Sequence, residues 1–186
     1  MNLEEKTTAT REIFNGRIIR VREDDVVLPD GTPAKREIVE HNGGVAVAAI
    51  DEDGKMLMVK QFRKPFERVT LEIPAGKLEK GENPMECGMR ELREETGYIA
   101  DKLTHLGTIY PTPAYCEEKI NIYFADNLKK SQQSLDDDEF LEVYRYSVDE
   151  LYEMVIGGEI CDAKTVCAIL RVKLLYSEGR LKDGKK

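Results

Sequence analysis

Residues 76–98, GKLEKGENPMECGMRELREETGY, join a polar loop to one short helix that is rich in acidic residues. Asn83 is a favourable N-cap, and Pro84 suits the first helical position because its missing N–H would have no partner there. Gly97 can adopt the left-handed conformation that ends a helix. The pattern therefore predicts a helix that begins after Asn83 and stops at Gly97.

This predicted helix has two distinct faces. At about 100° per residue, Glu91, Glu94 and Glu95 share one face. An apolar stripe is turned away from them, and it comprises Met85, Gly88, Met89, Leu92 and Thr96. We expect the stripe to pack against the protein and the acidic side chains to face outward.

The acidic face predicts a bound cation. Glu91 and Glu95 stand four residues apart, where like charges destabilise a helix by roughly 0.2–0.5 kcal/mol. Arg90 can orient Glu94 through an ion pair, but one arginine cannot neutralise the whole cluster. Clustered carboxylates suit Mg²⁺ or Mn²⁺, and the lack of a cysteine–histidine ligand set argues against zinc. The alternative is a solvated helix with salt bridges, the ordinary reading of a glutamate-rich helix.

The spacing of the whole stretch resembles the Nudix box. Gly76 is followed after five residues by Glu82, and after seven more by the run RELREETGY. The box ends in an aliphatic residue, and Tyr98 at that packing position is the one departure from it. The resemblance implies an α/β (α+β) fold, the Nudix α/β/α sandwich with a mixed sheet. It also implies hydrolysis of a nucleoside diphosphate linked to another moiety.

The same resemblance implies a set of metal ligands. The carboxylates of Glu91 and Glu95 and the carbonyl oxygen of Ala75 are the expected inner ligands. Glu94 and Glu82 are expected to complete or orient them. Mg²⁺ is the expected ion, with Mn²⁺ as an alternative, and it would screen the diphosphate and lower the pKa of a bound water.

Composition agrees with a single enzyme. The chain has 186 residues and a net charge of −8, which disfavours nucleic acid and anionic membranes as partners. The sequence shows no apolar leader and no membrane-length apolar run, so a cytoplasmic location is expected. Four cysteines lack disulfide or metal-ligand spacing and indicate free thiols in a reducing compartment.

The N-terminal segment predicts a separate β unit. Residues 17–28 are rich in β-branched side chains, and Pro29-Asp30-Gly31 makes a turn before a second strand at 34–40. Residues 1–42 therefore predict an N-terminal β extension, ahead of a Nudix domain at 43–186. The extension resembles that of the ADP-ribose pyrophosphatase branch, which exchanges with a second subunit and helps to build the substrate site. The resemblance implies a homodimer.

The remaining elements alternate between strands and helices. Strands are predicted at 45–50, 56–62, 68–73, 103–110, 120–125 and 140–146. The third of these runs directly into Pro74, Ala75 and Gly76, so the sheet leads the chain into the box. Two helices close the chain, one begun by the capping box of Ser147 with Glu150 and one capped by Asp162.

The sequence IYPTPAYCEEK at residues 109–119 bears on the substrate. Pro113 stands fifteen residues after Tyr98, which resembles the proline that marks the ADP-ribose branch. Ala114 stands where that branch commonly has glycine, so the local backbone can differ. The alternative is a rigid turn of no special function. Glu118 matches an acidic position of the branch and is expected to position a water or bind the ribose.

Three further substrate contacts follow from the resemblance. KQFRKP at residues 60–65 is similar to the branch's Gln-Phe-Arg segment, in which the arginine grips the phosphates. Arg63 takes that role here, because a planar guanidinium matches phosphate oxygens bidentately; the alternative is a surface arginine at a strand end. Arg36 and Glu37 stand where the branch places adenine contacts, although a one-residue slip would reverse their faces.

The acidic segment SLDDDEFLEV at residues 134–143 is either a solvated loop or the carrier of the general base. The branch places a catalytic glutamate on a mobile loop here. Glu139 is the predicted base, with Asp138 and Glu142 as alternatives and Glu94 or Glu118 next.

The implied reaction converts ADP-ribose and water to AMP and ribose 5-phosphate. Another nucleoside diphosphate sugar or a dinucleotide is the nearer alternative. A module that binds ADP-ribose without cutting it would be expected to lose box glutamates, and this chain keeps them all.

Overall fold

The computed structural model describes residues 2–137 and 139–181, so Asp138, an alternative general base, lies outside the described residues. The chain forms two compact units. The N-terminal unit comprises Met1–Gly43 together with Tyr110–Lys119, and the main unit comprises Gly44–Ile109 and Ile120–Lys186.

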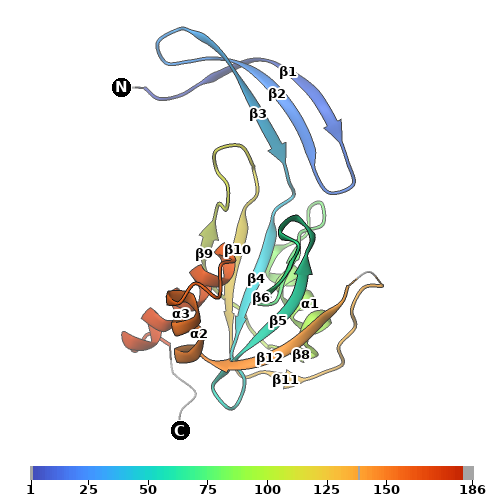
Figure 1. Cartoon of the computed structure of the whole chain (residues 1–186), viewed down its shortest axis with the longest axis vertical. Coiled ribbons are helices and arrows are strands. Elements are labelled where there is room, and N and C mark those ends of the chain that lie inside the picture. The colour runs from blue at the N-terminus through green and yellow to red at the C-terminus, as the bar shows by residue number, and fades with distance from the viewer. Residues whose placement is uncertain (1, 138, 182–186) are drawn as a thin grey trace. The chain divides into compact units, whose positions relative to one another are not determined.

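The main unit is built around strand β4 (Gly44–Ala49). This strand pairs in parallel with β10 (Ile120–Ala125) and antiparallel with β7 (Ala75–Lys77). Strand β9 (Thr104–Ile109) pairs antiparallel with β10 and completes a mixed sheet of order β7-β4-β10-β9. Figure 1 labels β4, β10 and β9 of this sheet. β7 carries the first residues of the box, so the box begins inside the sheet.

A second, antiparallel sheet has the order β12-β5-β6. Its strands are β12 (Leu141–Ser147), β5 (Lys55–Arg63) and β6 (Arg68–Glu72). A short 3₁₀ turn, η1 (Lys64–Phe66), joins β5 to β6, and two-residue strands β8 (Tyr98–Ile99) and β11 (Lys129–Lys130) pair with each other. Predicted strand ends agree with these bounds to within one or two residues.

Both faces of β4 are buried, because its side chains alternate between two hydrophobic clusters. Val45, Val47 and Ala49 pack with Cys87 and Leu92 of helix α1 (Pro84–Thr96). The alternate residues Ala46, Ala48 and Ile50 pack with helices α2 (Val148–Ile156) and α3 (Ala163–Ser177). Helices therefore cover both faces of the sheet (Figure 1), and the predicted α/β/α sandwich is confirmed.

The ends of α1 follow the predicted caps. The side chain of Asn83 accepts a hydrogen bond from the backbone N–H of Met85 at 2.9 Å. Gly97 has a φ of 71°, and its N–H donates to the carbonyl oxygen of Arg93 at 2.9 Å. The predicted capping box at Ser147 and the Asp162 cap of α3 are also present. Local capping chemistry thus places all three helices.

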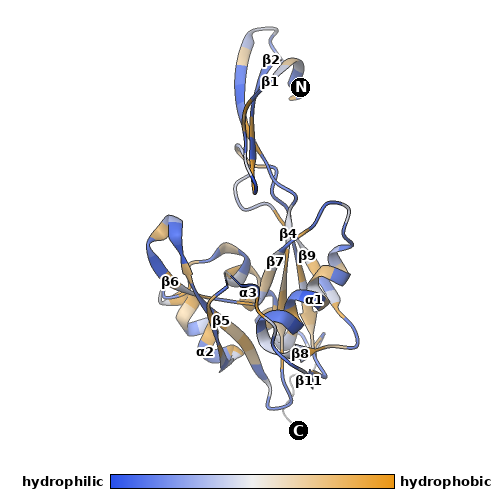
Figure 2. Ribbon diagram, turned by 90° about the vertical axis from the view of Figure 1, so that its right-hand side faces the viewer, coloured by the Kyte–Doolittle hydropathy of each residue, from blue (hydrophilic) through white to orange (hydrophobic). Residues whose placement is uncertain are grey.

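The N-terminal unit is a three-stranded antiparallel sheet of order β1-β2-β3. The predicted hairpin corresponds to β2 (Arg20–Val27) and β3 (Pro33–Glu40). The sequence did not predict β1 (Lys6–Asn15), because all ten of its side chains are exposed and most are polar. Figure 2 shows hydrophilic colour along much of these strands. Without a buried face, the strand has no clear hydrophobic period of two to detect.

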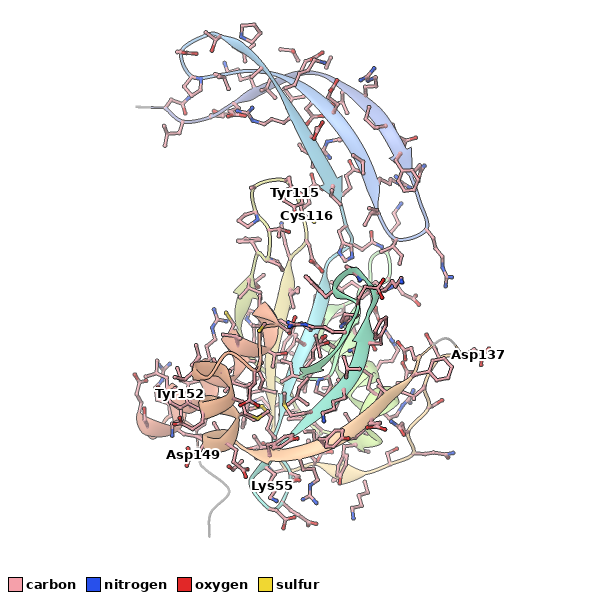
Figure 3. All side chains as sticks on the ribbon, viewed as in Figure 1. Lys55, Tyr115, Cys116, Asp137, Asp149 and Tyr152 are labelled. Carbon is pink, nitrogen blue, oxygen red and sulfur yellow. The ribbon has the colours of Figure 1, made fainter. Side chains whose placement is uncertain are left out.

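Residues 110–119 belong to the N-terminal unit although they follow β9. The N–H of Val39 donates to Tyr115 O at 2.7 Å, and the N–H of Glu117 donates to Val39 O at 2.9 Å. Arg22 on β2 also binds the Glu117 carboxylate at 2.9 Å. Figure 3 labels Tyr115 and Cys116 in this loop. Backbone pairing and an ion pair thus join the proline-containing loop to β2 and β3.

Two further properties complete the description. No helix in the described part of the chain has the length and apolarity needed to cross a bilayer. All four cysteines are free thiols, at positions 87, 116, 161 and 167.

Candidate active site

The two central glutamates of the box are buried. Glu91 and Glu95 are 8% and 3% exposed, so the expectation that the acids face outward is wrong for both. The reason lies in Gly76. A Cβ atom there would stand 1.9 Å from Oε1 of Glu91, so the missing side chain leaves the room in which that carboxylate sits. The close approach of box loop and helix therefore requires a glycine.

Burial raises the pKa of both carboxylates. The pKa of Glu95 is raised to about 8, chiefly by burial, while the N–H of Ala75 opposes this by donating to Oε2 at 2.9 Å. Burial is also the main cause of the raised pKa of Glu91. The negative charge of Glu139 adds to both shifts. Two buried acids beside a third negative charge form a site that favours a cation.

Arg90 organises the outer edge of this site. Its Nε lies 3.2 Å from Oε1 of Glu82, and its Nη1 lies 2.9 Å from Oε1 of Glu91 and 3.0 Å from Oε2 of Glu94. Arg93 holds the other oxygen of Glu94 at 2.9 Å. One arginine thus connects three of the predicted metal-site glutamates.

The donor set suits a hard divalent cation. Ala75 offers a backbone carbonyl, and Glu91 and Glu95 offer buried carboxylates on the adjoining helix. In the described residues no three acidic, cysteine or histidine side chains already converge as a metal site. The contacts explain this, because Glu91 is turned to Arg90 and Glu95 to the Ala75 N–H. A cation at this place would replace those contacts.

The acidic segment before β12 presents its carboxylates differently. Glu139 is half-buried, and its N–H donates to Asp136 O at 3.0 Å, which closes a tight turn. Asp137 is exposed and labelled at the outer end of the loop in Figure 3. Glu142 instead accepts from the Tyr144 hydroxyl at 2.7 Å. The charge of Glu139, a described residue of this segment, therefore acts on both buried box glutamates.

Arg63 lies in an ion-pair cluster that sequence reasoning missed. Its Nε and Nη2 donate to the two carboxylate oxygens of Glu72 at 2.8 and 2.7 Å. Lys164 of α3 also donates to Glu72. Glu72 had a detectable signal, since it is an acid between the apolar residues Leu71 and Ile73 in the segment that leads into the box. Lys164 had none, because it is 92 residues from Glu72.

The other predicted substrate residues lie in the N-terminal unit. Arg36 is held by Glu5 through bonds of 2.9 and 2.6 Å. Glu37 is its neighbour on β3 and points to the opposite face, so one strand does not bring both to a common side. Pro113 is exposed in a turn, and Glu118 lies 3.6 Å from Nδ1 of His41.

Comparison with known proteins agrees with these features. Residues 40–168 match the NUDIX domain family, and residues 5–39 match the nucleoside diphosphate sugar hydrolase N-terminal domain. An ADP-ribose pyrophosphatase of Bacillus subtilis (strain 168) is 47% identical, and the alignment covers 93% of this chain and 95% of that protein. A methanol dehydrogenase activator of Bacillus methanolicus is 44% identical, with coverage of 92% and 94%.

A solved structure shares the fold. The crystal structure of an ADP compounds hydrolase matches with a TM-score of 0.84 at 23% identity, and the match covers 97% of this chain and 100% of the other. The box on α1, the sandwich around β4 and the match over residues 40–168 lead to one conclusion: this chain belongs to the Nudix family.

Proposed function

We propose that this protein hydrolyses ADP-ribose to AMP and ribose 5-phosphate. The observation that carries the proposal is the pair of buried carboxylates, Glu91 and Glu95, held against the backbone of Ala75 and Gly76 in a Nudix box. The substrate class is supported by 47% identity to a relative named ADP-ribose pyrophosphatase. The N-terminal match to nucleoside diphosphate sugar hydrolases supports the same class.

The site suits the divalent metal on which Nudix hydrolases generally depend. The carbonyl of Ala75 and the carboxylates of Glu91 and Glu95 would hold it, with Glu94 and Glu82 oriented by Arg90. We propose Mg²⁺ as the ion, with Mn²⁺ able to replace it. When bound, such an ion screens the diphosphate oxygens and makes a coordinated water acidic.

The side chains of the protein have separate roles in the proposed reaction. Glu139, close enough for its charge to act on Glu91 and Glu95, takes the proton from the attacking water. Arg63, fixed by Glu72, binds the diphosphate through its remaining N–H groups. Each group acts on a different part of the substrate, so their substitutions have separable kinetic effects.

We further propose that residues 1–42 form a dimerisation extension ahead of a hydrolase domain at 43–186. All of β1 is exposed, including Ile13 and Phe14, and an uncovered sheet of this kind favours pairing with a second copy. The homodimer would bring the adenine and ribose contacts of Arg36, Glu37, Pro113 and Glu118 to the substrate. The four free thiols suit a cytoplasmic location.

A substrate panel tests the proposal. ADP-ribose, GDP-mannose and a nicotinamide dinucleotide are each incubated with Mg²⁺ or Mn²⁺, and the products are separated by anion-exchange chromatography. We expect the highest kcat/KM for ADP-ribose, with AMP released. A higher kcat/KM for GDP-mannose or the dinucleotide would contradict the substrate while leaving the Nudix chemistry intact. Binding of ADP-ribose with no product would instead indicate a non-catalytic module.

The 44% identical relative favours one second candidate, activation of an alcohol dehydrogenase. It is tested by adding the protein to a methanol dehydrogenase assay, with a Glu95→Gln variant as the control. Stimulation by the wild-type protein alone would mean that activation requires the box. Equal stimulation by both proteins would mean that activation is a binding effect.

A further inference from the structure

A buried cluster of charges lies between the second sheet and the start of α3. It contains Arg63 at the end of β5, Glu72 at the end of β6, the N-cap Asp162 of α3 and Lys164 in the first turn of that helix. Glu72 is 1% exposed and Lys164 is 8% exposed. Buried charges of this kind are costly unless they are paired, so their arrangement calls for a specific reason.

The Glu72 carboxylate is fully occupied. Oε1 accepts from Arg63 Nε at 2.8 Å and from Thr70 Oγ1 at 2.7 Å. Oε2 accepts from Arg63 Nη2 at 2.7 Å and from Lys164 Nζ. A carboxylate offers about four acceptor positions, and all are used here. The guanidinium plane of Arg63 is consequently fixed at two points.

Arg63 keeps one edge for a ligand. Its side chain is 38% exposed, and Nη1 makes no hydrogen bond within the residues that the structure describes. Glu72 uses two of the five N–H donors, so three remain. An oriented guanidinium with a free outer edge is suited to phosphate oxygens.

Lys164 occupies an unfavourable position for a cation. The N-terminus of a helix carries partial positive charge, and a lysine in the first turn is repelled by it. Two anions compensate, Glu72 and Asp162, the latter at 3.0 Å from Nζ. Asp162 also caps the helix by accepting from the N–H of Thr165 at 3.0 Å. The fold thus brings a lysine to Glu72 at a point where the helix dipole does not favour a cation.

The charge count gives the reason. Arg63 and Glu72 alone would form a neutral pair with little attraction for a dianionic diphosphate. With Lys164 added, the three side chains that meet at Glu72 carry a net charge of +1. Asp162 brings the four-residue cluster to zero, but its carboxylate lies against Lys164 and the first N–H groups of α3, so the exposed edge of Arg63 keeps its positive charge. We propose that Lys164 supplies the counter-charge of Glu72, so that Glu72 orients Arg63 without cancelling the charge that binds the diphosphate. Glu72 and Lys164 are then positioning residues.

The cluster is also connected to the box. Thr165 Oγ1 accepts from the N–H of Ile73 at 3.1 Å, two residues before Ala75, whose N–H binds Glu95. The positive charge of Lys164 offsets part of the rise that burial causes in the pKa of Glu95. The inference rests on the phosphate role proposed above for Arg63, which it deepens.

A double-mutant cycle tests the inference with ADP as the probe, measured by titration calorimetry without metal. Lys164→Met should weaken ADP binding about tenfold, the cost of one charge-assisted contact. In an Arg63→Met background the same change should alter the dissociation constant by less than about twofold. If the two losses are additive, Lys164 does not act through Arg63 and the inference is overturned.

A second arm isolates charge from packing. Glu72→Gln in the Lys164→Met background removes the uncompensated anion, so the double variant should bind ADP more tightly than Lys164→Met alone. If the double variant instead bound ADP more weakly than Lys164→Met, the inference would be overturned. That result is expected if each substitution acts by disturbing the packing, because two packing defects would add. Lys164→Gln replaces Lys164→Met if the latter does not melt cooperatively.

The control is Lys173→Met on the same helix, where the lysine pairs with Asp149 on the surface. It should bind ADP like the wild-type protein, and a tenfold loss there would overturn the inference by showing a general charge effect. If Arg63→Met itself binds ADP normally, Lys164 has no arginine charge to preserve and the inference fails. The proposed activity is judged separately, by ADP-ribose turnover of the wild-type protein.

Discussion

The main unit and the N-terminal unit each contain a β-sheet, but the two sheets differ in how much apolar surface they bury. In the main unit, β4 is buried on both faces by two hydrophobic clusters. In the N-terminal unit, β1 is exposed along its whole length, and Val26 is the only buried hydrophobic residue among those described. A sheet with so little apolar burial is marginal alone. The difference is consistent with the proposal that a second copy of the chain completes the N-terminal unit.

The two units also use charge differently. Arg22 joins β2, β3 and the 110–119 loop through Glu40 and Glu117, whose side chains are 35% and 47% exposed. Exposed pairs of this kind contribute about 0–1 kcal/mol each. In the main unit, Glu72 and Glu95 are almost wholly buried and their pKa values move in opposite directions. In the N-terminal unit, ion pairs connect strands and loop at the surface. In the main unit, buried charges lie in and beside the candidate active site.

The largest effect is expected from the buried box glutamates. Glu91→Gln or Glu95→Gln should each lower turnover by about a thousandfold or more, because a ligand charge is lost with little change in volume. Both variants should fold, and the metal-free melting temperature of Glu95→Gln should rise, since the variant removes the free-energy cost of burying an ionisable carboxylate. Glu86→Gln, an exposed glutamate in the first turn of the same helix, is the control and should turn over normally. Wild-type rates in both variants would refute the metal assignment.

The general base gives the next effect. Glu139→Gln should lower kcat about 10²- to 10⁴-fold with metal affinity nearly unchanged, because only proton transfer is lost. Glu142→Gln, whose carboxylate accepts from Tyr144, should have a smaller effect. Rapid-quench turnover with parallel metal titration separates the two steps. If Glu142→Gln is the impaired variant, the base has been assigned three residues too early.

The proposed dimer predicts a smaller loss. Phe14→Glu should abolish a dimer and lower activity about tenfold at nanomolar protein, since a buried charge at an apolar contact costs several times RT. Sedimentation velocity should then change from twice the chain mass to one. The matched control is Ile156→Glu, an exposed apolar residue of the main unit, which should change neither mass nor rate. A wild-type monomer that is fully active at nanomolar concentration would remove the contrast between the units.

The last effect concerns the pH dependence of stability rather than turnover. The pKa of Glu95 is raised to about 8 from an ordinary value of 4.5, so the folded protein binds a proton there that the unfolded chain has released. Stability without metal should therefore fall as pH rises from 4.5 to 8. Each kcal/mol lost lowers the melting temperature by about 2–4 °C in a chain of this size. Calorimetry at pH 5 and pH 8 measures the slope, and an equal slope in Glu95→Gln would assign it to another group.

The sequence predicted what local chemistry controls. The bounds of α1 follow from Asn83, Pro84 and Gly97, and those of β10 follow from a continuous apolar run. The box was identified by its resemblance to that of a known family, and the family and fold were expected from that resemblance. Strand β1 was missed because its exposed, mostly polar side chains show no clear periodicity of burial.

Features that depend on distant contacts were not predictable. Helical periodicity predicted that Glu91 and Glu95 would face solvent. In the structure both are buried, because Gly76 leaves space for the Glu91 carboxylate and the N–H of Ala75 donates to Glu95. The Glu72 cluster joins residues 9 and 92 positions apart, and no local pattern connects them. Burial of a polar side chain is a property of the assembled fold rather than of its own element.

The pairing of residues 110–119 with β3 has a consequence for chain connectivity. The polypeptide passes between the two units at residues 43/44, 109/110 and 119/120. The N-terminal unit therefore cannot be removed by a single truncation of the chain. Deleting residues 1–43 would remove Val39, the only described backbone partner of the 110–119 segment outside the segment itself. Ten residues would then be left between β9 and β10 without that pairing. Chimeras that exchange specificity between relatives must therefore transplant both segments together, as one discontinuous cassette.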